Sequence, residues 1–176
     1  RKKYDIVFYS SGGRKLFDNI SINPYCFFHL KELAKSKKIL VIETDLNFDK
    51  SFQKIGCDYL CIPWPMARII SVFKFLNKTE KNEILNLQSL LKNSFQHSIN
   101  IKLIIKNNFL PQVILNGIIK IILKISEAKL TGLINNGSSK FFLKAAHDLG
   151  IELIELQHGD VSELDIATSY PKNIEG

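Results

Sequence analysis

His158 is the side chain best suited to acid–base chemistry, because it directly follows the apolar run at residues 151–156. That run predicts a strand, and Gly159 allows a sharp turn after it. In open parallel sheets, ligands bind beyond the carboxyl ends of strands. An imidazole there can act as a base near neutral pH, since its free pKa is about 6.5. The alternative is a histidine that only forms a hydrogen bond within a turn.

A glycine- and serine-containing turn follows the first predicted strand and includes Ser11, Gly12 and Arg14. Glycine lets backbone amides approach a ligand closely, and an arginine can bind a phosphate or carboxylate through two nitrogens. The turn is not a Walker loop, because no Gly-Lys-Ser/Thr follows, and it does not fit the dinucleotide-binding fingerprint. The sequence is equally compatible with an anion-binding loop and with a solvated turn.

A second turn of this kind, at residues 135–138, precedes a helix that we predict from about residue 139 to 149. Asn136 and Ser138 lie at its start, where free N–H groups favour an anion. Ser138 is a good N-cap, which by itself would explain the serine, and Gly150 is a good helix stop.

Two further residues follow predicted strands. Glu43 could bind a sugar hydroxyl or cap a loop, and we favour the cap. Trp64 lies between two prolines and could stack on a sugar ring, although a core or rim tryptophan is more common.

The elements that must position these residues alternate along the chain. We predict strands at 4–10, 38–43, 59–62, 131–135 and 151–156, and helices at 23–36, 67–77, 79–97 and 139–149. Such alternation predicts an α/β fold: one Rossmann-like domain over residues 1–176, with a mainly parallel sheet flanked by helices.

Residues 99–125 permit more than one interpretation. The segment 99–106 could be helix or strand, and 111–125 is a broad apolar helix with Asn116, Lys120 and Lys124 four residues apart. This helix could be buried between the sheet and another helix, which we favour. It could pack against a second domain or subunit, or lie in a membrane interface with its lysines reaching the headgroups. We find no uninterrupted apolar stretch long enough to span a bilayer.

The chain is basic, with a formal charge of +7 and a pI near 9.3, which favours anionic partners. Its aromatic residues are scattered, so we expect no nucleic-acid partner. Cys26, Cys57 and Cys61 have no zinc-binding spacing and suit a reducing cytoplasm. We see no signal peptide, and therefore expect a cytoplasmic protein that could associate with a membrane.

The run Glu155-Leu156-Gln157-His158-Gly159, with Ser162 and Ser169-Tyr170-Pro171, resembles bacterial GT-B glycosyltransferases of capsular and other cell-surface polysaccharides. The resemblance covers residues 152–171. Residues 5–11 and Arg14 add to it by resembling the family's opening strand and Ser/Arg loop. The chain departs from the family at Asp165-Ile166, where a second His-Pro pair is expected.

The resemblance implies the N-terminal, acceptor-side half of such an enzyme, with the nucleotide-sugar-binding domain beyond Gly176. His158 would deprotonate the acceptor hydroxyl, Gln157 would orient the ring or the acceptor, and Gly159 would keep the approach open. The other substrate-binding residues would be Ser11, Gly12, Arg14, Asn136, Ser138 and Asp160.

The resemblance implies a nucleotide-sugar donor and a glycan or lipid-linked acceptor as partners, and no cofactor. It also implies no metal, because the chain lacks an Asp-x-Asp motif and the family stabilises the leaving phosphate with helix dipoles and basic groups. The alternative is a non-catalytic α/β module that binds an anionic ligand or a partner protein. Asp165, in place of the second histidine, slightly favours this alternative.

Overall fold

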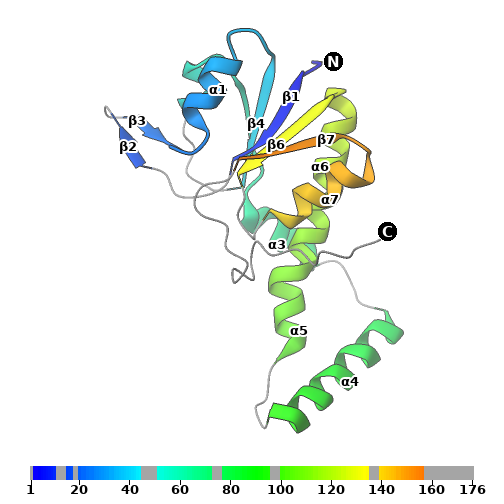
Figure 1. Cartoon of the computed structure of the whole chain (residues 1–176). Coiled ribbons are helices and arrows are strands. Elements are labelled where there is room, and N and C mark those ends of the chain that lie inside the picture. The colour runs from blue at the N-terminus through cyan, green and yellow to red at the C-terminus, as the bar shows by residue number, and fades with distance from the viewer. Residues whose placement is uncertain are drawn as a thin grey trace.

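The computed structural model describes residues 2–10, 15–17, 20–44, 51–72, 77–95, 100–134 and 139–156. Its centre is a five-stranded parallel sheet with the strand order β5-β4-β1-β6-β7 (Figure 1). The strands are β1 (Ile6–Tyr9), β4 (Ile39–Glu43), β5 (Asp58–Cys61), β6 (Leu130–Ile134) and β7 (Glu152–Leu156). The predicted Rossmann-like α/β fold is therefore confirmed.

Two groups of helices cover the two faces of the sheet. On one face, α1 (Phe27–Leu33) and α2 (Ser51–Lys54) contribute Phe27, Leu30 and Phe52 to a buried cluster with β1 and β4. On the other face lie α3 (Trp64–Val72), α6 (Leu110–Ser126) and α7 (Lys140–Asp148).

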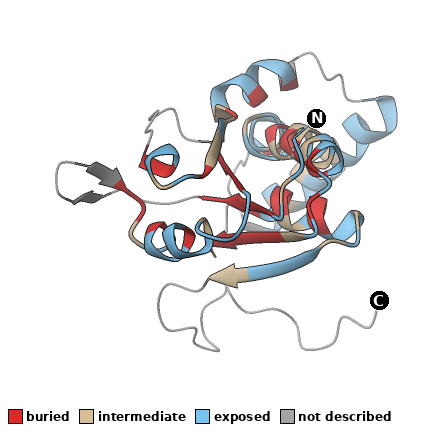
Figure 2. Cartoon of the chain, turned by 90° about the horizontal axis from the view of Figure 1, so that it is seen from above, coloured by how far each residue is buried: buried red, intermediate tan, exposed pale blue. Residues whose placement is uncertain are grey.

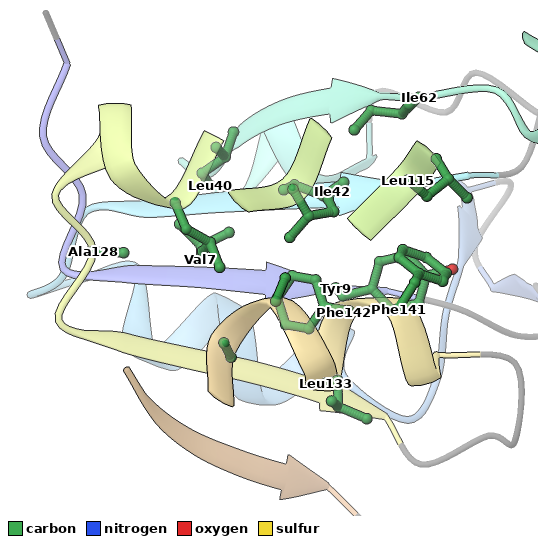
Figure 3. Close-up of a cluster of buried hydrophobic side chains, with 14 of the residues drawn as sticks. Val7, Tyr9, Leu40, Ile42, Ile62, Leu115, Ala128, Leu133, Phe141 and Phe142 are labelled. Carbon is green, nitrogen blue, oxygen red and sulfur yellow. The ribbon is translucent and has the colours of Figure 1, made fainter. Parts of the chain in front are cut away.

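The second face holds the larger core, whose side chains are drawn in Figure 3. Tyr9 lies at its centre, with ring centroids 5.2 Å from Phe141 and 5.4 Å from Phe142. Leu115 of α6 is fully buried in the same cluster. Burial of such large side chains provides most of the favourable free energy of folding, so this face fixes how the sheet and α6 are placed.

The segment that allowed several interpretations is one continuous helix, Ile101–Ser126, formed by α5 (Ile101–Ile104), η1 (Ile105–Phe109) and α6. Its α6 part packs against α3, α7 and the sheet, as we favoured. The polar strip faces α7: Asn116 donates to the Phe141 carbonyl at 2.9 Å, and Lys120 pairs with Asp148 at 2.5 Å.

This helix corrects our expectation about membrane spans. By length and composition alone, Ile101–Ser126 could cross a bilayer, with a mean hydropathy of 1.5 over its most apolar window and 33% of that window buried in the protein. The helix continues past Pro111, which lies just after the π-helical segment η1, so the apolar stretch is longer than we expected.

Three short elements were not predicted. A hairpin is formed by β2 (Lys15–Phe17) and β3 (Ile20–Ile22), and α2 precedes β5. A turn occupies residues 24–26, so α1 begins at Phe27, later than the predicted start at Asn23-Pro24. The remaining long helix, α4 (Lys78–Phe95), was predicted with nearly these bounds.

The final strand is less buried than its apolar sequence suggested. Figure 2 shows β7 exposed at the rim of the sheet, next to β6. Leu153 and Ile154 are exposed. Both side chains are apolar, but β7 has only one neighbouring strand among the described residues, and neither of its faces is fully covered.

Candidate functional site

The candidate site is the carboxyl edge, defined here by the ends of β1, β6 and β7 at Tyr9, Ile134 and Leu156. After β1, the chain adds β4 and then β5 on one side of β1. It then adds β6 and β7 on the other side of β1. The strand order therefore reverses between β1 and β6. In open α/β sheets, ligands bind at the carboxyl side of such a switch point.

The predicted site residues follow the ends of these neighbouring strands in the sequence. Tyr9 is in register with Leu133, and Ile134 with Leu156, so the three ends lie at one edge. The residues themselves lie outside the described part of the chain: Ser11, Gly12, Arg14, Asn136, Ser138, Gln157, His158, Gly159 and Asp160.

A buried polar cluster supports the end of β1. Ser10 and Asn23 are buried, and the Asn23 amide donates to the Ser10 hydroxyl at 3.2 Å. The Cys26 thiol also donates to the Ser10 oxygen, at 3.8 Å. Asn23 Oδ1 accepts a hydrogen bond from the Tyr25 amide at 3.1 Å, which holds the turn before α1. This network ties Ser10, the residue after β1, to the turn before α1.

The polar residues after β4 have structural partners. Glu43, at the end of β4, is buried and accepts a hydrogen bond from the Tyr59 hydroxyl of the neighbouring strand β5 at 2.8 Å. The loop that it was expected to cap lies outside the described residues. The Tyr9 hydroxyl and the Thr44 hydroxyl are 2.9 Å apart. Trp64 is half-buried against the larger core, in agreement with the structural role we expected to be more common.

Glu155 is a carboxylate at this edge that the sequence interpretation did not assign to the site. Its Oε1 atom is buried and has no hydrogen-bond partner within the described residues. It lies opposite Leu133 on β6 and two residues before Gln157. A buried acceptor without a donor is unfavourable, so Glu155 is a candidate for binding a donor group of a ligand.

The described histidines lie away from this edge. The His147 side chain on α7 is 91% exposed, and His29 is exposed on α1. Among the described residues, no group of three His, Cys, Asp or Glu side chains is placed to hold a metal ion. Burial, with a smaller effect of Asp58, raises the pKa of the Cys57 thiol to about 11, as expected for a core cysteine.

An apolar groove of about 540 Å³ lies on the α1 side of the sheet. Ile154 and Leu156 of β7 line it together with Phe28 and Leu33 of α1. Its lining is almost wholly hydrocarbon, so it offers few groups that could orient a sugar.

No protein-family model and no curated protein matches the chain. One solved structure that is similar to it is a glycosyltransferase. This is the crystal structure of CalG4, the calicheamicin glycosyltransferase, with a TM-score of 0.46 and 10% sequence identity. The similarity covers 92% of this chain and 34% of that one, so this chain spans about a third of the length of CalG4.

The sequence contains a signal for the β2–β3 hairpin, which we did not predict. Asp18-Asn19 separates two short runs that contain apolar residues, and two turn-forming residues in such a place are typical of a hairpin. The Tyr59–Glu43 pair left no such signal, because it depends on the register of β4 with β5. The start of α7 was misplaced by one residue: Ser139 occupies the N-cap position that we assigned to Ser138.

Proposed function

We propose that this chain is the acceptor-side part of a GT-B glycosyltransferase of surface polysaccharide biosynthesis. It would transfer a sugar from a nucleotide-sugar donor to a glycan or lipid-linked acceptor. The remainder of a two-domain enzyme would bind the donor, and the protein would act in the cytoplasm.

The observation that carries this proposal is the meeting of three strand ends at one edge. The Ser/Arg turn follows β1, the Asn136 turn follows β6, and the Gln157-His158-Gly159 run follows β7. These strands are neighbours and parallel, although the three segments are far apart in the sequence. A sheet that brings together, at its switch point, the strands that precede these segments supports a binding site there.

In the proposed reaction, His158 removes the proton of an acceptor hydroxyl while its oxygen attacks the anomeric carbon of the donor sugar. The bond from that carbon to the donor phosphate breaks, and the nucleotide leaves with the electron pair. Ser11, Gly12, Arg14, Asn136, Ser138, Gln157, Gly159 and Asp160 would bind the acceptor or the donor phosphate. The buried Oε1 atom of Glu155 is a further acceptor that could hold a hydroxyl.

The test is His158→Ala in the longest chain that carries residues 1–176, with His147→Ala as the matched control. A panel of nucleotide sugars and oligosaccharide acceptors would be scanned for release of the nucleotide. General-base catalysis contributes about 10²–10⁴-fold, so His158→Ala should lose at least about a hundredfold in turnover. The control should keep full activity because His147 is exposed on α7.

Each alternative outcome has a distinct meaning. Full turnover by His158→Ala would remove His158 as the base. Saturable binding of a sugar or glycan without any transfer, measured by calorimetry on the same chain, would favour the non-catalytic binding module.

A further inference from the structure

An arm, defined as α4 together with α5 and η1, projects from the domain. The arm precedes α6 in the sequence. Helix α6 ends at the amino end of β6, where the Ser126 carbonyl accepts a hydrogen bond from the Tyr4 amide. At about 1.5 Å per residue, α6 carries the chain roughly 25 Å along the sheet. The arm therefore lies beyond the carboxyl side of the sheet, away from the body of the domain (Figure 1).

The arm exposes large apolar side chains. No described side chain of α4 is buried, and Leu85 and Leu90 are each 63% exposed. Phe109 of η1 is 61% exposed. The large apolar side chains that the described part of the arm exposes are Leu85, Leu87, Leu90, Leu103, Ile104 and Phe109.

Three of these side chains line grooves between α4 and the long helix. Leu87 and Phe109 line one groove of about 310 Å³, together with Glu80 and Glu83. Leu85 lines a second groove with Lys81 and Lys102. Single exposed apolar residues need no explanation, whereas several on one projecting element indicate an interaction surface.

The charge of the arm has one dominant sign. Residues 78–95 and 101–109 contain five lysines and two glutamates, a net charge of +3. The lysines are Lys78, Lys81, Lys92, Lys102 and Lys106. None of them forms a salt bridge with another described residue, whereas Lys2, Lys3 and Lys120 in the body of the domain all do. An apolar surface flanked by such lysines complements a partner that has an anionic outer layer over an apolar interior.

A transmembrane orientation is excluded for this helix in the folded domain. Its α6 half is held in the core by Leu115, Ile119 and Leu123. Only residues 101–109 extend beyond that core, and nine residues span about 14 Å of the roughly 30 Å hydrocarbon layer. A surface of this length and composition suits the boundary between headgroups and acyl chains.

We propose that the arm docks this protein on an anionic lipid bilayer, with its leucines and Phe109 in the headgroup–acyl boundary and its lysines at lipid phosphates. The contact surface is residues 84–94 and 101–109, which differ from the apolar helix 111–125, whose inner face is core. The docking does not depend on the proposed transfer reaction. If that reaction occurs, the arm would bring the carboxyl edge close to a lipid-linked acceptor.

The experiment is vesicle flotation of the whole chain with phosphatidylglycerol–phosphatidylcholine vesicles and with phosphatidylcholine vesicles. Binding should be strong only with the anionic vesicles and should weaken in high salt, because headgroup attraction is screened. Leu85→Ser with Leu90→Ser should reduce binding at least about tenfold. The matched control, Leu33→Ser with Ile154→Ser, changes exposed apolar side chains outside the arm and should bind normally.

A second pair of variants tests the charge. Lys102→Glu with Lys106→Glu should reduce binding at least about tenfold, since each lysine near an anionic surface contributes roughly a fivefold factor. Lys37→Glu with Lys140→Glu changes the net charge equally at exposed sites outside the arm and should bind like the wild type. Circular dichroism confirms that each variant is folded.

Three results would overturn the proposal. One is the absence of anionic-vesicle binding by the wild-type chain. Another is equal loss of binding in arm and control variants, which would indicate a non-specific charge effect. The third is a dimer in light scattering that Leu85→Ser with Leu90→Ser converts to a monomer, without any vesicle binding, because the arm would then bind a second copy.

Discussion

The two halves of the helix Ile101–Ser126 have similar apolar sequences but opposite surroundings. In the α6 half, Leu115 and Ile119 are fully buried against the sheet. In the α5 and η1 half, Leu103 and Phe109 are exposed. Apolar composition along a helix therefore does not determine burial, which depends on whether a neighbouring element covers that part.

The lysines of the two halves differ in the same way. Lys120 in α6 shares the Asp148 carboxylate with Lys144 of α7. Lys102 and Lys106 have no ion pair within the described residues, since no described acidic side chain of the body reaches the arm. The first half is thus fixed inside the domain, and the second is available for an external partner.

The π-helical segment η1 lies at the boundary between the halves. A π turn contains an additional residue, which offsets the helix faces on its two sides by about 100°. The buried stripe of α6 therefore does not continue along the same face into α5. This offset turns apolar side chains that precede η1 away from the core.

The largest expected difference between the two regions is in stability. Leu115→Ala removes a fully buried side chain and should lower the free energy of unfolding by about 3 kcal/mol. Leu90→Ala, at a site 63% exposed, should change it by less than about 0.5 kcal/mol. Urea unfolding of both variants measures this difference. Equal losses would mean that α4 is covered in solution and would remove the distinction between body and arm.

Two glycine substitutions compare a crowded position in β6 with an open position in α6, both in the body of the domain. A Cβ at Gly132 of β6 would lie 2.5 Å from Phe8 Cδ2, so Gly132→Ala should destabilise the protein by about 1–3 kcal/mol. At Gly117 of α6, a Cβ would meet nothing within 4 Å. Gly117→Ala should therefore stabilise by about 0.5–1 kcal/mol, since alanine is the better helix former. Thermal melts that moved in the same direction for both variants would contradict this assignment.

The sequence allowed the α/β class and the parallel alternation to be predicted, because buried strands such as β1 and β4 are continuous apolar runs. It could not fix which strand lies at an edge. Leu153 and Ile154 are as apolar as the residues of β4, yet their exposure depends on β7 having only one neighbour among the described strands. Strand order arises from long-range pairing, which no local pattern encodes.

The same limit applies to the candidate site. The predicted turns could be placed in the chain by their glycines, serines and His158, but not in space. The common edge of the strands that precede them depends on β6 lying on the other side of β1. The roles of Glu43 and Glu155 likewise depend on sheet register, so a side chain expected to cap a loop is paired with Tyr59.

The smallest expected effect concerns the ion pairs of Asp148. Lys120 of α6 takes part in them, whereas the arm lysines Lys102 and Lys106 have none among the described residues. Hydrogen bonds from Lys120 and then Lys144 lower the pKa of Asp148 from 3.8 to about 2. A carboxyl whose folded pKa is lowered stabilises the fold above its unfolded pKa, and this stabilisation is lost as the pH falls through the folded value. Asp148→Asn should therefore lower the melting temperature at pH 7 but not near pH 2. Lys102→Gln in the arm should leave the melting temperature unchanged at pH 7, because Lys102 has no carboxylate partner among the described residues. A melting-temperature difference for Asp148→Asn that stayed constant down to pH 2 would show that its ion pairs contribute nothing, and that only the loss of packing matters at this position.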